Sequence, residues 1–240
     1  MQIDELRIYA ECLEQGLDFK DYFLEIDNSL LIRNIYLPKF KNEPLETDST
    51  LLKILKLKSF DLAISIVSAH SEIPILLVEY STAVPTDDHK MQRSDVYFWS
   101  GIFRIPVMKI SPLSKNSFGK HGGGDKISNS DEFLLALSNN AIVYFIDFPH
   151  RDNVLLTSKQ RLSCIEKNSA ISNVLSMLVE KIKAYKDFAS LYEDLLQSLK
   201  LHSTSLKSLR NIFVDSTRFS REGADIVVKI NRFGHAMDFE

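Results

Sequence analysis

Cysteine is scarce in this chain. Cys12 and Cys164 are its only cysteines, too few for a disulfide framework or for a zinc site of four thiolates. The first residues, Met1 to Glu5, are too polar for a secretory signal, and no apolar run is long enough to span a bilayer. These absences predict a protein of the reducing cytoplasm that has no membrane partner.

An excess of charge of either sign is also lacking. The 29 Lys and Arg residues against 32 Asp and Glu residues leave a net charge of −3, so nucleic-acid binding would need a local basic face. Glycine (8) and proline (7) are few among 240 residues, and 45% of the chain is hydrophobic. Such a chain can bury a substantial core, and one domain with an appendage is the expected organisation.

The spacing of apolar residues predicts a mixture of helices and strands. The expected helices cover residues 4–16, 86–103, 131–138 and 169–201, with a helical or mixed stretch at 19–26. The expected strands cover residues 30–37, 50–57, 73–78, 106–110, 141–148 and 224–230, with a hairpin turn at 69–72. This order predicts an α/β (α+β) fold with a mixed central β-sheet flanked by helices.

Two apolar runs each carry one carboxylate where an uncharged residue would be expected. Asp61 lies in the run FDLAI, and Glu79 follows the run ILLV. Carboxylates are rarely buried unless they are paired or bound to a cation. If the two runs pair as neighbouring strands, the carboxylates converge and provide the hard oxygen ligands that suit Mg2+.

An Asp in one strand, a Glu-x-Lys at the end of the next, then a helix and another strand resembles the PD-(D/E)xK nuclease core. Many type II restriction endonucleases share this core, and the resemblance covers Asp61 to Pro112. It implies a restriction-endonuclease-like core within residues 1–155. Residues 156–240 would add a helical region and a terminal strand to the same domain. The implied activity is Mg2+-dependent hydrolysis of phosphodiester bonds in double-stranded DNA.

Ser81 stands where the resemblance places the lysine. Lys90 and Gln92, in the first turn of the expected helix, are candidates to complete a catalytic set with Asp61 and Glu79. In the family, the cation positions the attacking water and stabilises charge in the transition state.

Two further residues bear on the missing cation. Lys109, on the following strand, is a weaker candidate to supply it. Some family members carry a Gln-x-x-x-Tyr pattern in the helix, but Tyr97 lies one residue too far from Gln92 to match it.

Candidate DNA contacts fall in two segments. His89 and Arg93 lie at the start of the expected helix, where backbone amides favour an anion. Lys120 and Lys126 lie in the glycine-rich segment 116–130. The alternative interpretations are an ordinary solvated helix turn and an ordinary surface loop.

The resemblance also implies partners. Palindromic DNA sites favour a homodimer, for which the long apolar stripe of residues 169–201 leaves room. A restriction enzyme would have a cognate methyltransferase or a partner subunit. The chain stops soon after residue 230 without an obvious closing element, as a fragment of a longer protein would.

Other interpretations stay open from the sequence alone. Asp61 could be a surface residue at a strand end, and Glu79 a paired structural acid. A non-catalytic nucleic-acid-binding or assembly module could retain the nuclease fold, and the missing lysine favours it. A protein-interaction domain built around residues 169–201 is a third hypothesis.

Overall fold

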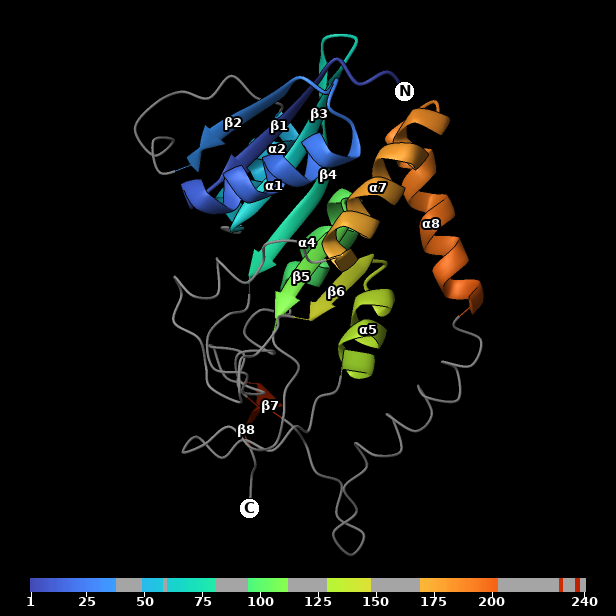
Figure 1. Ribbon diagram of the computed structural model, residues 1–240. Helices are drawn as coiled ribbons and strands as arrows, with labels where there is room; N and C mark the ends of the chain where they lie inside the picture. The colour runs from blue at the N-terminus through green and yellow to red at the C-terminus, as the bar shows by residue number, and fades with distance from the viewer. Residues whose placement is uncertain are drawn as a thin grey trace, which may run out of the picture.

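A six-stranded mixed sheet forms the centre of the molecule in a computed structural model (Figure 1). The structure describes residues 1–37, 49–57, 60–80, 95–111, 129–147, 169–202, 229–230 and 236–237. The strand order is β2-β1-β3-β4-β5-β6. The strands of the sheet are β1 (Glu5–Ala10), β2 (Ile32–Tyr36), β3 (Leu62–Ser68), β4 (Ser71–Tyr80), β5 (Val107–Ser111) and β6 (Val143–Asp147). A separate antiparallel pair joins β7 (Lys229–Ile230) to β8 (Ala236–Met237).

Strand directions divide the sheet into two parts. β1 runs parallel to β2 and antiparallel to β3, and β3 and β4 form an antiparallel hairpin. β4, β5 and β6 then run parallel to one another. Consequently β4, β5 and β6 all end at the same edge of the sheet. The predicted mixed α/β fold, with a mixed sheet flanked by helices, is confirmed.

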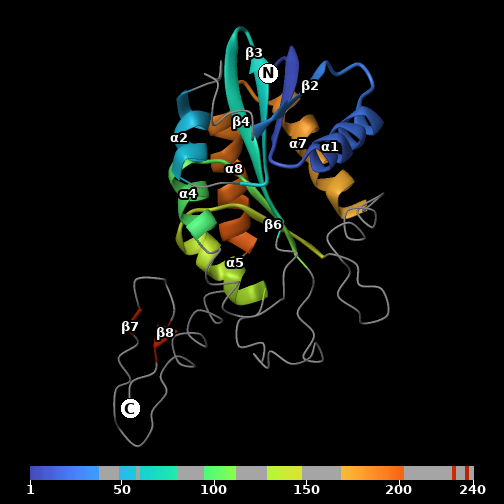
Figure 2. The same cartoon turned by 90° about the vertical axis from the view of Figure 1, so that its left-hand side faces the viewer.

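Helices cover both faces of the sheet (Figure 2). One face packs against α1 (Leu13–Ile26) and α7 (Ser169–Ala184). The opposite face packs against α2 (Ser49–Leu57), α4 (Asp95–Phe103) and α5 (Asn129–Ser138). None of the helices in the described ranges is both long enough and apolar enough to cross a membrane.

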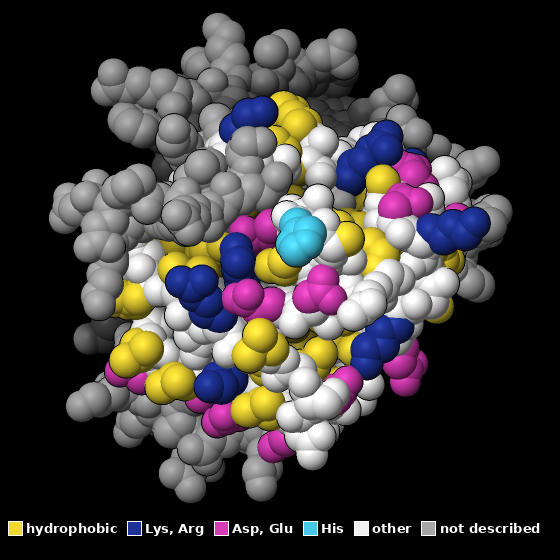
Figure 3. Space-filling model, turned by 90° about the horizontal axis from the view of Figure 1, so that it is seen from above, with side chains coloured by type: hydrophobic (Ala, Val, Ile, Leu, Met, Phe, Trp, Pro, Cys, Tyr) yellow, Lys and Arg dark blue, Asp and Glu magenta, His cyan; other side chains and the backbone are white. Residues whose placement is uncertain are grey.

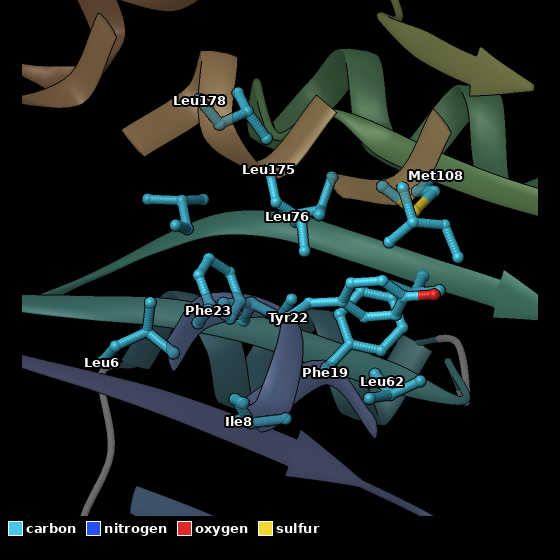
Figure 4. Close-up of a cluster of buried hydrophobic side chains, with 14 of the residues drawn as sticks. Leu6, Ile8, Phe19, Tyr22, Phe23, Leu62, Leu76, Met108, Leu175 and Leu178 are labelled. Carbon is cyan, nitrogen blue, oxygen red and sulfur yellow. The ribbon is translucent and has the colours of Figure 1, made fainter. Parts of the chain in front are cut away.

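The larger core lies between the sheet and the helices α1 and α7. Figure 4 shows Phe19, Tyr22 and Phe23 of α1 directed toward the strands, with Leu175 and Leu178 of α7 nearby. Residues along a strand alternate between faces, so β3 and β4 contribute to both cores. This explains why both strands are almost continuously apolar.

A register shift interrupts the β3–β4 hairpin. Ile64 pairs with Leu76, but the next residue, Ser65, pairs with Pro74, which leaves Ile75 as an extra residue on β4. Ile75 and Leu76 therefore both face the core under α1 and α7. A proline cannot donate to a sheet ladder, and a bulge is the usual place for it within a strand.

The predicted helix at residues 4–16 is wrong. Residues Glu5–Ala10 form β1, and α1 begins only at Leu13. Leu6 and Ile8 face one core while Tyr9 faces the other. A strand buried on both faces carries few polar residues, so its apolar positions can mimic helical spacing.

The predicted strand at residues 50–57 is also wrong, because these residues belong to α2. Leu51, Ile54 and Leu55 recur at the three- and four-residue spacing of a helix. Leu51 and Ile54 are fully buried in the core under α2, α4 and α5.

The predicted single helix at 169–201 is two helices. α7 ends at Ala184, and α8 (Phe188–His202) begins after a break. Asp187 caps α8, since its Oδ1 accepts from Ser190 N at 2.8 Å. The amino group of Met1 donates to the Ile182 and Lys183 carbonyls near the end of α7, at 2.9 and 3.3 Å.

The apolar stripe of α7 is not a dimer interface. Its stripe of Ile171, Leu175, Leu178, Val179 and Ile182 is buried within this chain. The stripe therefore belongs to the core and is not available to a second copy. α8 packs beside β6, where Tyr192 Oη donates to the Asn140 carbonyl at 2.8 Å.

The remaining predicted elements in the described ranges are confirmed with small shifts. These are β2, the hairpin turn after Ser68, β4, β5, α5, β6 and the part of the 86–103 helix from Asp95 onward. Of the strand predicted at 224–230, only Lys229 and Ile230 fall within the described residues.

Gly101 leaves no room for a side chain where α4 meets the turn after α5. A Cβ built at Gly101 would lie 1.8 Å from the Asn139 carbonyl oxygen, in the turn that follows α5. The comparable distance at Gly16, from its Cβ to that of Ala10, is 3.2 Å. Only glycine therefore allows α4 to reach its position beside this turn.

We expect Gly101→Ala to lower the free energy of unfolding by at least about 2 kcal/mol, because overpacking outweighs the gain in helix propensity. Gly16→Ala is the matched control and should change stability by less than about 1 kcal/mol. Urea unfolding of both variants measures the difference. Equal effects at the two positions would contradict the packing argument.

Asp27 and Lys183 join the end of α1 to the end of α7. Lys183 Nζ lies 2.8 Å from Asp27 Oδ2. The Lys183 hydrogen bond, followed by those from Ser29, lowers the pKa of Asp27 to about 2. A carboxyl group whose pKa is lower in the folded state stabilises the fold above its unfolded pKa, and the contribution is lost as the pH falls through the folded pKa.

Wild type should therefore be more stable than Asp27→Asn at neutral pH. The difference should shrink as the pH falls from about 4 toward about 2. Urea unfolding of both proteins across this range tests the expectation. A difference that stays constant with pH would show that the carboxylate charge is irrelevant to the contact.

Candidate functional site

Asp61 lies immediately before β3 and is bonded to two neighbouring segments. Its backbone carbonyl accepts from Glu11 N at 2.9 Å. Its side-chain Oδ2 accepts from the backbone N–H of Tyr80, the last residue of β4, at 2.7 Å. The Asp61 side chain thus fixes the start of β3 to the end of β4.

Asp61 and Glu79 lie at the same end of the β3–β4 hairpin. Leu62 pairs with Val78 there, with Asp61 just before Leu62 and Glu79 just after Val78. The Asp61 side chain is bonded to the N–H of Tyr80, the residue that follows Glu79. The two carboxylates that the sequence singled out therefore belong to neighbouring segments of the fold.

Glu79 is a buried carboxylate, with 5% of its surface exposed. Its neighbours Val78 and Tyr80 face the core under α1 and α7, whereas Leu77 faces the core under α2 and α4. By alternation Glu79 lies on the Leu77 side. A carboxylate in this position is costly to bury unless cationic or hydrogen-bonding groups compensate it.

Lys109 is the buried cation closest in register to Glu79. The two residues are paired on the parallel strands β4 and β5. Lys109 is 1% exposed, and its Nζ donates to Tyr97 Oη of α4 at 3.3 Å. The ammonium also lies 5.8 Å from the centre of the Tyr97 ring, within the range of a cation–π contact.

Tyr80 carries its hydroxyl on the other side of the sheet. Burial raises the pKa of Tyr80 well above its ordinary value, and the charges of Asp18 and Asp61 add to the effect. Tyr80 therefore stays neutral at physiological pH.

The other predicted site residues lie outside the described part of the chain. They are Ser81, His89, Lys90, Gln92, Arg93, Lys120 and Lys126. Their catalytic and DNA-binding roles remain predictions. In the sequence Lys109 is a weaker candidate than Lys90, because nothing in the run VMKI indicates that Lys109 pairs in register with Glu79. A lone lysine inside an apolar strand was the available signal.

The donor chemistry at this sheet edge fits a hard divalent cation. Asp61 and Glu79 supply carboxylate oxygens, which Mg2+ prefers, and Mg2+ commonly binds one or two carboxylates while retaining several waters. Among the residues that the structure describes, no group of three or more His, Cys, Asp or Glu side chains could hold a metal ion. The two carboxylates would therefore hold it together with water or substrate oxygens.

A second buried polar cluster lies toward the hairpin turn. Glu72 accepts from Arg7 Nη1 at 2.9 Å, from Tyr9 Oη at 2.7 Å and from Ser65 Oγ. These groups come from β1, β3 and β4 and join the strands beside the bulge. One carboxylate with a cation and two hydroxyls is a satisfied structural network.

Figure 3 looks onto the end of the molecule that carries the β3–β4 turn. Cationic and anionic side chains intermingle there, and neither sign gathers into a continuous patch. The carboxylates of Asp61 and Glu79 lie at the opposite end of these strands. The described residues on this face therefore form no continuous cationic surface.

A scan against models of protein families, a search of curated proteins and a search of solved structures each found no match to this chain.

Asp61→Ala should lower the free energy of unfolding by about 1–3 kcal/mol, because the Tyr80 amide loses its acceptor. Asp61→Asn retains a side-chain carbonyl oxygen and should lose less. Urea unfolding of the two variants tests the role of this hydrogen bond. An equal loss in both variants would assign the effect to charge alone.

Proposed function

We propose that this protein is a Mg2+-dependent DNA endonuclease of the PD-(D/E)xK type, resembling a type II restriction endonuclease. The observation that carries the proposal is the placement of Asp61 and Glu79. Both lie at the same end of the β3–β4 hairpin, where Asp61 Oδ2 accepts from the N–H of Tyr80, the residue after Glu79, and Glu79 is buried. Carboxylates from two such neighbouring segments would supply the oxygen ligands of a metal site of the kind that supports phosphodiester hydrolysis.

The sheet topology supports this assignment. Asp61 directly precedes β3, Glu79 lies in β4, α4 follows, and β5 then pairs parallel to β4. This order of strand, strand, helix and strand is the one on which the resemblance was based. A restriction-endonuclease-like core formed by these elements remains part of the proposal.

In the proposed reaction a water molecule adds to phosphorus and the bond from phosphorus to one sugar oxygen breaks. The products are a phosphate monoester and an alcohol, so one water is consumed for each cut. Bound Mg2+ would act as a Lewis acid and promote formation of hydroxide. Asp61 and Glu79 would hold the ion, with Asp61 oriented by its bond to Tyr80 N.

Double-stranded DNA is the proposed substrate. His89, Arg93, Lys120 and Lys126 are the proposed phosphate contacts, and Lys90, Gln92 and Ser81 remain candidates to complete the site. Recognition of a palindromic site would favour a homodimer. A cognate methyltransferase or a partner subunit also belongs to the proposal.

A non-catalytic nucleic-acid-binding or assembly module is the second candidate. Ser81, which stands at the position of the expected lysine, favours it. This candidate predicts salt-sensitive DNA binding without cleavage, since phosphate contacts alone give affinity.

Cleavage of plasmid and phage DNA with Mg2+, and with EDTA as a blank, tests the proposal. Wild type should give discrete fragments, while Asp61→Asn and Glu79→Gln should reduce cleavage at least about 100-fold through loss of metal affinity. Glu25→Gln, an exposed position on α1, is the matched control and should cut as wild type does.

Each other outcome has a defined meaning. Cleavage that persists in Glu79→Gln would place the catalytic site elsewhere or indicate a contaminant. DNA binding without cleavage by wild type would favour the non-catalytic module. Neither binding nor cleavage would exclude both nucleic-acid functions and favour a protein-interaction domain.

A further inference from the structure

We infer that Lys109, on the strand beside Glu79, is the catalytic cation of this site. The inference rests on the proposed function and names a residue for a role that Ser81 cannot fill. The Glu-Tyr-Ser sequence itself does not identify Lys109 for this role. The register between β4 and β5 identifies it.

Lys109 is a charged side chain that is almost completely buried. Lysine is almost never fully buried unless it is paired, and an ammonium group in an apolar environment is costly. Lys109 is 1% exposed within a strand whose neighbours Met108 and Ile110 are also buried. The fold therefore retains a charge at this position where an apolar residue would pack at less cost.

Strand geometry places Lys109 beside Glu79. Neighbouring strands of a sheet lie about 4.8 Å apart. Glu79 and Lys109 are paired Cα partners, and both lie on the α4 side of the sheet by alternation with Leu77 and Val107. A lysine on β5 can thus lie beside the Glu79 carboxylate from the neighbouring strand.

Tyr97 fixes the direction of the lysine. Its hydroxyl accepts from Lys109 Nζ at 3.3 Å, and Tyr97 itself is fully buried in α4. This contact orients the ammonium group. We assign Tyr97 as a positioning residue that acts through Lys109.

The role of Lys109 is electrostatic. As water oxygen adds to phosphorus, negative charge increases on the non-bridging oxygens, and an ammonium donor stabilises it. Lys109 keeps its proton throughout. The proton released by the water goes to solvent or product, and the departing sugar oxygen gains a proton to become the alcohol.

The test compares Lys109→Met, Lys109→Arg and the control Lys53→Met in single-turnover cleavage of plasmid DNA. Lys53 is exposed on α2, a helix on the same face of the sheet. Calorimetry measures Mg2+ binding, and urea unfolding shows that each variant is folded. If Lys109→Met does not fold, Lys109→Gln replaces it, because its amide can still donate to Tyr97.

We expect Lys109→Met to cut at least about 100-fold more slowly at saturating DNA, with Mg2+ affinity and KM changed by less than about threefold. Lys109→Arg should recover at least about tenfold of that loss because it restores the charge. Lys53→Met should be unchanged. Tyr97→Phe should lower the cleavage rate about tenfold without changing Mg2+ affinity.

Two results would overturn the assignment. In the first, the Lys109→Met variant is folded and cuts DNA at the wild-type rate, while Glu79→Gln is inactive. This result would leave the proposed function intact and would show that Lys109 is only a structural counter-ion. In the second, the wild-type protein neither binds Mg2+ nor cuts DNA. This result would contradict both the proposed function and the role of Lys109.

Discussion

Pairing of β3 with β4 is the constraint on which the rest of the structure depends. These two strands are the middle of the sheet and contribute to both cores. Their register is strongly specified, because slipping by one residue would exchange the buried faces. The same register sets Asp61 beside the end of β4. Packing and site geometry are therefore consequences of one hairpin.

The site lies where the buried charge in this fold is concentrated. Glu79 and Lys109 are two of the few charged residues buried in the described chain, and they are paired in register on adjoining strands. Apolar residues would pack on this face at less cost than opposite charges, which supports the proposed chemical role. The Glu72 cluster differs, because its printed hydrogen bonds account for a structural network.

The sequence was informative where burial gives one clear pattern. The run ILLV and the run AIVYFIDF could be assigned as strands because continuous apolar stretches of that length suit a covered parallel sheet. The sequence did not allow β1 and α2 to be assigned correctly. Both are short, and tertiary burial overrides the local spacing of apolar residues in such segments. The break between α7 and α8 was missed because the apolar stripe continues across it, while the cap at Asp187 is a local signal.

For the candidate site, Asp61 and Glu79 could be found because each interrupts an apolar run. The partnership of Glu79 with Lys109 could not, because it depends on which strands are neighbours. Nor does the sequence report that Tyr97 lies beside Lys109, since that contact depends on how α4 packs on the sheet.

The extra residue at Ile75 has a consequence for how this site could have arisen or could be redesigned. For each residue of β4 after the bulge, the face of the sheet on which its side chain lies depends on the number of residues between it and the start of the strand. Removing one residue there would turn Glu79 toward α1 and bring Tyr80 to the face of Lys109. A single-codon insertion or deletion there would thus change the face of the sheet on which Glu79 lies, with no change in any residue of the proposed site itself.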